Sequence, residues 1–166
     1  MRTGNFWWLA AVIAAHEGHR VVGRTRLQKT VKLLQRLGLP TDYRYSIFFY
    51  GPYSEGVFGD VQLLQQMGLV REEEHPGEGS NPCFILTACP EAALDELSNW
   101  RPAIDLMQRA EAVVLELAAT YDAFREMGSE HDEAVARLKH KKASRWNEER
   151  HQRALGLLHG LGLPVD

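Results

Sequence analysis

The chain has 166 residues, of which 45% are hydrophobic and 25% are charged, and its formal net charge is −3. This length and composition fit one domain, or a small module with an appended helical bundle, and they exclude a disordered chain. The negative net charge excludes a general attraction to nucleic acid or anionic lipid, so that any such attraction must be local. The two cysteines, Cys83 and Cys89, are too few for a disulfide framework and lack CxxC spacing.

The first apolar segment is predicted to be a buried helix over residues 5–17. Arg2 followed by this apolar run resembles a signal peptide, but the pair Trp7-Trp8 is bulky for one and no A-x-A cleavage site follows. The chain contains no apolar stretch of the roughly 18 residues that a membrane span needs. We therefore expect a cytoplasmic protein that does not contact a membrane.

A second helix is predicted to begin at Thr25, which forms a capping box with Gln28. Apolar residues then recur at helical spacing over residues 27–37, and Gly38 is typical of a helix end. The next segment, residues 43–50, is dense in aromatic and β-branched side chains and predicts a strand that ends in a Gly-Pro turn at 51–52.

Ser54 is the predicted N-cap of a third helix that closes at residues 67–68. Residues 69–74 and 83–87 flank a Pro/Gly-rich turn and predict a β-hairpin. This order is close to that of a winged helix-turn-helix. It departs from that pattern because only one full helix fits between the strand over 43–50 and the hairpin.

The remaining chain has a purely helical pattern. The predicted helices cover residues 91–99, 102–127, 129–142 and 147–161. We therefore expect a mainly α fold with a small three-stranded sheet, organised as a winged-helix module over 1–89 and a C-terminal helical segment over 90–166 that packs on it.

Three segments carry a resemblance to known proteins: GRTRLQK at 23–29, YGPYS at 50–54 and LLQQMGLV at 63–70. With them the chain resembles the YwgA-like family of bacterial and archaeal proteins. It is similar, more distantly, to the Panacea or SocA-like antitoxin domain, which shares the Leu-Gln-Lys and Tyr-Gly-Pro segments. The resemblance implies a winged-helix fold and, from the antitoxin relatives, a regulatory role exerted by binding a protein. It brings no catalytic residues.

The charge of the third helix and hairpin is opposite to that of a DNA-reading winged helix, which presents cations there. Residues 51–81 carry one arginine and six acidic residues, Glu78 among them, for a net charge of −5. This surface is a candidate site for a basic partner. Its candidate residues are Glu55, Asp60, Gln62, Gln66, Glu72, Glu73 and Glu74. The two glutamines also allow a DNA alternative, because glutamine can pair bidentately with adenine.

Basic residues gather in two other segments. Residues 20–44 have a net charge of +6, and a helical projection places most of these cations opposite the apolar face of the second helix. The candidate stripe consists of Arg24, Arg26, Lys29, Lys32 and Arg36. A second candidate patch consists of Arg137, Lys139, Lys141, Lys142 and Arg145. Each set is either a solvated helix face or a site for phosphate or an acidic protein surface.

No motif of an enzyme is present. The chain has no Gly-rich phosphate loop, GxSxG or HExxH, and His16 and His19 have no nearby carboxylate trio. We expect no catalytic residue, cofactor or metal. The sequence thus predicts a non-enzymatic regulatory or adaptor module with a protein partner. The alternative is a DNA-binding regulator that uses the two basic patches, as a homodimer; a small enzyme is a third hypothesis.

Overall fold

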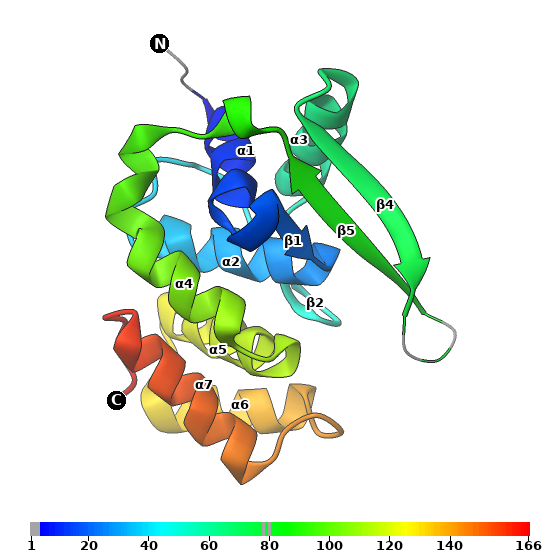
Figure 1. The fold of residues 1–166 in the computed structure, drawn as a ribbon. Helices are drawn as coiled ribbons and strands as arrows, with labels where there is room; N and C mark the ends of the chain where they lie inside the picture. The colour runs from blue at the N-terminus through cyan, green and yellow to red at the C-terminus, as the bar shows by residue number, and fades with distance from the viewer. Residues whose placement is uncertain (1–3, 78, 80) are drawn as a thin grey trace.

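The computed structural model describes residues 4–77, 79 and 81–166; Arg2 and Glu78, both considered above, lie outside them. Within the described residues the chain is mostly helical, with a small antiparallel sheet of three strands (Figure 1). The α-helices are α1 (Asn5–Ala15), α2 (Arg24–Arg36), α3 (Glu55–Gln66), α4 (Arg101–Arg109), α5 (Ala112–Glu126), α6 (His131–Lys141) and α7 (Glu148–Gly160). The strands are β1 (Arg20–Val22), β2 (Ser46–Phe48), β3 (Gly51–Tyr53), β4 (Val70–Pro76) and β5 (Pro82–Ala88). Short 3₁₀ helices are η1 (Glu17–His19), η2 (Pro90–Ala92) and η3 (Asp95–Trp100).

The three-stranded sheet has the order β1-β5-β4, and both of its pairings are antiparallel. Leu86 in the central strand lies opposite Val21 on one side and Glu72 on the other, and its side chain is fully buried. The predicted hairpin is confirmed as β4 and β5. Strand β1 was not predicted, because three residues are too few to show an alternating pattern.

The core is built around α1 and α2. Residues 9–15 of α1 are buried, as expected for a helix that is apolar on every side. Helix α2 crosses the middle of the molecule in Figure 1, where it packs against α1 and β1 on one side and against α5 on the other. Helices α6 and α7 in turn pack on α5. Because α2 is covered on two sides, few of its side chains reach solvent.

The predicted strand over 43–50 is wrong in extent. Only residues 46–48 form a strand, and the predicted turn residues Gly51 and Pro52 belong to β3, which pairs with β2 as a separate hairpin. Gly51 is buried with a φ of +94°, and a Cβ there would collide with the hydroxyl of Thr120 on α5. This close approach to α5, rather than a turn, accounts for the glycine.

The predicted capping box is also wrong. Helix α2 begins at Arg24 after Gly23, with no side-chain cap, and the Gln28 amide bonds instead to the backbone of Ser54. By contrast, Ser54 is confirmed as the N-cap of α3, because its hydroxyl accepts a hydrogen bond from the Val57 amide. A side-chain cap acts on an amide three residues away, so a local sequence pattern predicts it. The bond from Gln28 to Ser54 spans 26 residues, and no local pattern predicts it.

The long helix predicted over 102–127 is broken into α4 and α5 at Ala110 and Glu111. No Gly or Pro marks this break. The guanidinium of Arg26 donates to the carbonyl oxygens of Met107 and Ala110 at 2.9 and 2.7 Å, which satisfies two groups at the end of α4. The helix predicted over 91–99 is the pair of 3₁₀ helices η2 and η3, whereas the last two helices are confirmed as α6 and α7.

Candidate functional site

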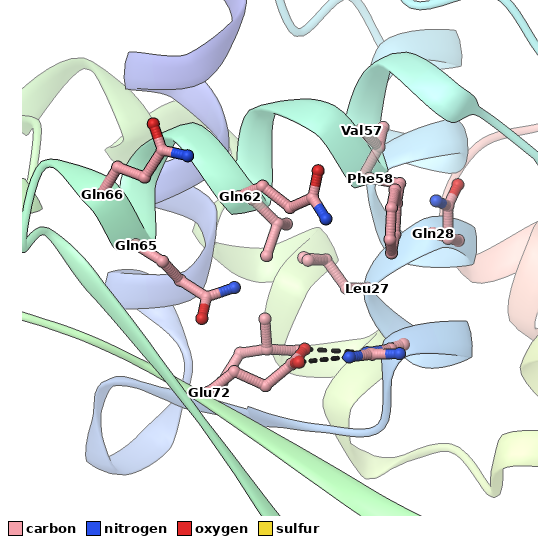
Figure 2. A pocket seen from close by; sticks show the side chains of 11 residues that line it. Leu27, Gln28, Val57, Phe58, Gln62, Gln65, Gln66 and Glu72 are labelled. Carbon is pink, nitrogen blue, oxygen red and sulfur yellow. Dashed lines mark hydrogen bonds and ion pairs between the residues drawn. The ribbon is translucent and has the colours of Figure 1, made fainter.

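A groove of about 470 Å³ lies between α3, the first turns of α2 and the root of the β4–β5 hairpin (Figure 2). Its floor is apolar and its rim is polar. The lining residues are Arg24, Leu27, Gln28, Val57, Phe58, Val61, Gln62, Gln65, Gln66, Glu72 and Leu86. A concave apolar surface with a few polar groups is typical of a binding site. We call it the α3 groove.

The two charged residues that line the α3 groove neutralise one another. Arg24 Nε donates to Glu72 Oε2 at 2.9 Å, and Nη2 bonds to the other carboxylate oxygen. The guanidinium also lies 3.7 Å from the centre of the Phe84 ring. The bond to Glu72 raises the pKa of Arg24. The cation is therefore neutralised by a carboxylate and packed on an aromatic face.

Three glutamines form the rim on the α3 side. Gln62, Gln65 and Gln66 stand at i, i+3 and i+4 on α3, and in Figure 2 the Gln65 side chain points toward the hairpin while that of Gln66 points away from it. Gln62 and Gln66 are exposed and Gln65 is half-buried. None of their amides has a hydrogen-bond partner within the part of the chain that the structure describes. Each amide thus offers a free donor and a free acceptor.

The candidate acidic residues are distributed unevenly around this groove. Glu72, with Gln62 and Gln66, lines it, whereas Asp60 accepts a hydrogen bond of 2.6 Å from the Tyr43 hydroxyl. The other candidates, Glu55, Glu73 and Glu74, are exposed. Glu73 lies 2.8 Å from Arg71 and 3.4 Å from His75. The sequence did not single out Gln65, although its place three residues after Gln62 puts it on the same helix face.

The basic stripe expected on α2 is wrong as a solvent-facing surface. Lys29 is 2% exposed and Lys32 is 5% exposed. Lys32 Nζ lies 2.7 Å from Glu126, and Arg36 Nε lies 2.8 Å from the fully buried Asp122. The helical projection placed this face of α2 in solvent, whereas α5 packs over it and supplies the carboxylates. A row of acidic residues on α5 at matching spacing was the signal that could have indicated this pairing.

Lys29 is the most deeply buried cation of the stripe. Its Nζ donates to the carbonyl oxygen of Pro52 at 2.7 Å and so ties β3 to α2. Burial lowers its pKa to about 8; Glu116 opposes this shift and Lys142 adds to it. Arg26 is likewise committed to the carbonyls at the end of α4. The side chains of the stripe therefore join α2 to β3, α4 and α5.

Two residues of the second basic patch, Lys142 and Arg145, also pair with groups inside the molecule. Lys142 is 3% exposed and donates to the Phe49 carbonyl at 2.7 Å and to Glu116 at 2.8 Å. Arg145 also bonds to Glu116, at 2.9 Å, and lies against the rings of Phe49 and Tyr50. The outer members of the patch have surface contacts. Arg137 bonds to Ser129, Lys139 lies over the Trp146 ring, and Lys141 is exposed.

The two histidines considered as metal ligands, His16 and His19, lie within hydrogen-bond distance of backbone carbonyl oxygens. The Nδ1 atoms of His16 and His19 lie 2.7 Å from the carbonyl oxygens of Val12 and Ala14. Burial lowers the pKa of His16. Among residues 4–77, 79 and 81–166, no group of three or more His, Cys, Asp or Glu is arranged to hold a metal ion. Within the same residues, none of the helices has the length and apolar character needed to span a membrane.

A protein of Bacillus subtilis is similar to part of this chain. No family model matches the chain. The matched region covers 60% of this chain and 63% of the relative, so the chain spans less than two thirds of that protein's length. This similarity agrees with the resemblance to YwgA-like proteins and carries no information on the antitoxin domain. Over 105 residues, the chain is 29% identical to the uncharacterized protein YwgA of Bacillus subtilis (strain 168).

Proposed function

We propose that the chain is a non-enzymatic regulatory or adaptor module that binds a protein partner in the α3 groove. The observation that carries this proposal is the chemistry of the groove. Free glutamine amides stand over an apolar floor, and the cation in the lining, Arg24, is neutralised by Glu72. Binding to a polyanion draws most of its affinity from free cations. A protein surface, by contrast, is recognised by apolar burial together with paired polar groups. The role would be that of an antitoxin or of a factor in complex assembly.

A winged-helix scaffold is part of the proposal. The order α1, β1, α2, α3, β4, β5, with a sheet ordered β1-β5-β4, supports it. Both α2 and α3 lie between β1 and the β4–β5 hairpin, so the missing helix of the sequence pattern is accounted for by the unpredicted strand β1. The small hairpin β2–β3 is inserted between the two helices. On this scaffold α3 stands in the position of the recognition helix.

The alternative, a DNA-binding regulator, has less support. It relied on free cations on α2 and near the end of α6. Within the described residues, Lys32, Arg36 and Lys142 each pair with a carboxylate on α5. A cation that is already paired releases fewer counterions when it meets a phosphate. A homodimer would not change this count, because each copy pairs its own cations.

Affinity capture tests the proposal. The tagged full chain is used to recover partners from its native cells, with and without nuclease, and the partners are identified by mass spectrometry. We expect one protein to be recovered regardless of nuclease. Recovery should be lost when Gln62 and Gln66, exposed on the rim of the groove, are both changed to Lys, and kept when Gln152, exposed on α7, is changed to Lys. Recovery that depends on nucleic acid would instead support the regulator.

A further inference from the structure

In two places within the described chain, a glutamine side chain binds both polar backbone groups of a single residue. Gln28 Nε2 donates to the Ser54 carbonyl at 2.9 Å, while Gln28 Oε1 accepts from the Ser54 amide at 2.8 Å. Gln35 does the same to Tyr43, with both bonds at 3.0 Å. In each case one amide satisfies both polar groups of one residue. At Ser54, with φ −121° and ψ 123°, that residue is extended.

The three glutamines on the rim of the α3 groove present the same pair of groups with no partner in the described chain. Gln62 and Gln66 are four residues apart, which is about 6 Å along a helix axis. Every second residue of an extended chain presents its N–H and C=O toward the same side, at a repeat of about 6.6 Å. The two glutamines therefore match residues k and k+2 of an extended chain laid along α3.

We infer that the α3 groove binds an extended peptide segment of the partner through its backbone. Gln62 and Gln66 pair with alternate residues of the segment, and Gln65 lies on the hairpin side of them. This inference rests on the proposed function and names its mode of recognition. An apolar side chain of the segment enters the floor formed by Leu27, Val61 and Leu86, since side chains of an extended chain alternate between its two faces.

The charge around the groove specifies the segment further. Glu74 on β4 is exposed and, two residues after Glu72, lies on the same face of the strand as that groove residue. A segment that carries Lys or Arg beside its apolar residue complements this surface, and an acidic segment is repelled. The same field disfavours the adenine-reading alternative, because phosphates would have to approach these carboxylates.

The first experiment identifies a ligand. A displayed library of random decapeptides is selected against the full chain, and binding of the enriched peptides is measured by fluorescence anisotropy. We expect the peptides to share an apolar residue flanked by Lys or Arg. The variants Gln62→Met and Gln66→Met keep the side-chain length and remove the amide, and each should weaken binding about tenfold. Gln152→Met, at an exposed position of α7, is the matched control and should bind like the wild type.

The second experiment tests backbone pairing directly. Each interior peptide nitrogen of the best decapeptide is methylated in turn, which removes one N–H donor at a time. Backbone pairing predicts losses of about tenfold or more at alternate positions and small changes at the positions between them. A scan in which only side-chain substitutions matter would overturn the inference.

The outcomes separate this inference from the proposed function. If a partner protein is captured without nucleic acid but no decapeptide binds, or N-methylation has no effect, the adaptor proposal stands and the extended-segment inference is wrong. If an A·T-rich duplex binds and Gln62→Met abolishes that binding, both are wrong. A peptide that binds with the two-residue period and depends on Gln62 and Gln66 supports both.

Discussion

Arg24 and Glu72, 48 residues apart in the sequence, form a two-bond ion pair that neutralises the charge in the lining of the α3 groove. The pair joins the first turn of α2 to strand β4 and places the guanidinium on the Phe84 ring. Because the side chain of Glu72 is only 11% exposed, a bound polyanion could not replace it without leaving a carboxylate poorly solvated.

This relationship predicts that Glu72→Gln creates an affinity for nucleic acid that the wild type lacks. The substitution keeps the shape of the side chain and frees the charge of Arg24. Binding of a random DNA duplex, measured over a range of salt concentrations, should become detectable, with a slope of log K against log salt of about −0.9 for the added contact. Adding Arg24→Gln should abolish the gain. A wild-type chain that already binds duplex with a steep slope would contradict the neutralisation of Arg24 by Glu72.

The Gln28 side chain is predicted to be a main support of the start of α3. Gln28 and Ser54 are 5% and 1% exposed, so Gln28→Ala leaves the amide and carbonyl of Ser54 buried without partners. We expect a loss of about 2–4 kcal/mol in the free energy of unfolding. Urea denaturation followed by tryptophan fluorescence measures it. Gln152→Ala should change the midpoint little, and an equally small change for Gln28→Ala would refute the role assigned to this amide.

Gly51 is predicted to be irreplaceable because of both its backbone angle and its neighbour. Gly51→Ala places a Cβ at a φ of +94° and against the Thr120 hydroxyl. The expected loss is about 2–4 kcal/mol in the free energy of unfolding. Thr120→Ala should recover part of it in a double-mutant cycle, since it removes the collision and leaves the backbone strain. Strictly additive losses would show that the two residues do not interact.

Lys29 gives stability a dependence on pH above neutrality. Its pKa is lowered to about 8 in the folded chain, against about 10.4 in the unfolded chain, so between these values the unfolded state binds more protons. Stability therefore rises with pH in this window, by at most about 1.4 kcal/mol per pH unit, and below it this contribution is constant and least favourable. Urea denaturation from pH 7 to 10 on the wild type and Lys29→Met isolates the effect. A difference between the two that does not change with pH would contradict it.

Features that depend on neighbouring residues could be predicted from the sequence. The Ser54 cap, the hairpin of β4 and β5 and the burial of α1 follow from side chains within a few positions. Features set by distant contacts could not. Strand β1 exists because Val21 pairs with Leu86, and α4 ends where Arg26 reaches its carbonyls from another helix.

The candidate site residues differ in the same respect: some lie where their own segment of sequence places them, and others are placed by contacts with a distant helix. Gln62, Gln66 and Glu72 were named from the composition of α3 and the hairpin, and they line one groove. The stripe on α2 was misplaced because a helical projection treats the polar face as the solvent face. In this chain that polar face meets the carboxylates of α5, as the buried pair of Arg36 and Asp122 illustrates.

Photo-crosslinking in the native cells tests the central claim, that the α3 groove receives a protein. A benzophenone amino acid is placed at position 62 in the groove and, as a control, at position 152 on α7. We predict a crosslink to one protein from position 62, unchanged by nuclease and missing from position 152. A crosslink from position 62 to nucleic acid, or the same crosslinks from both positions, would contradict the account.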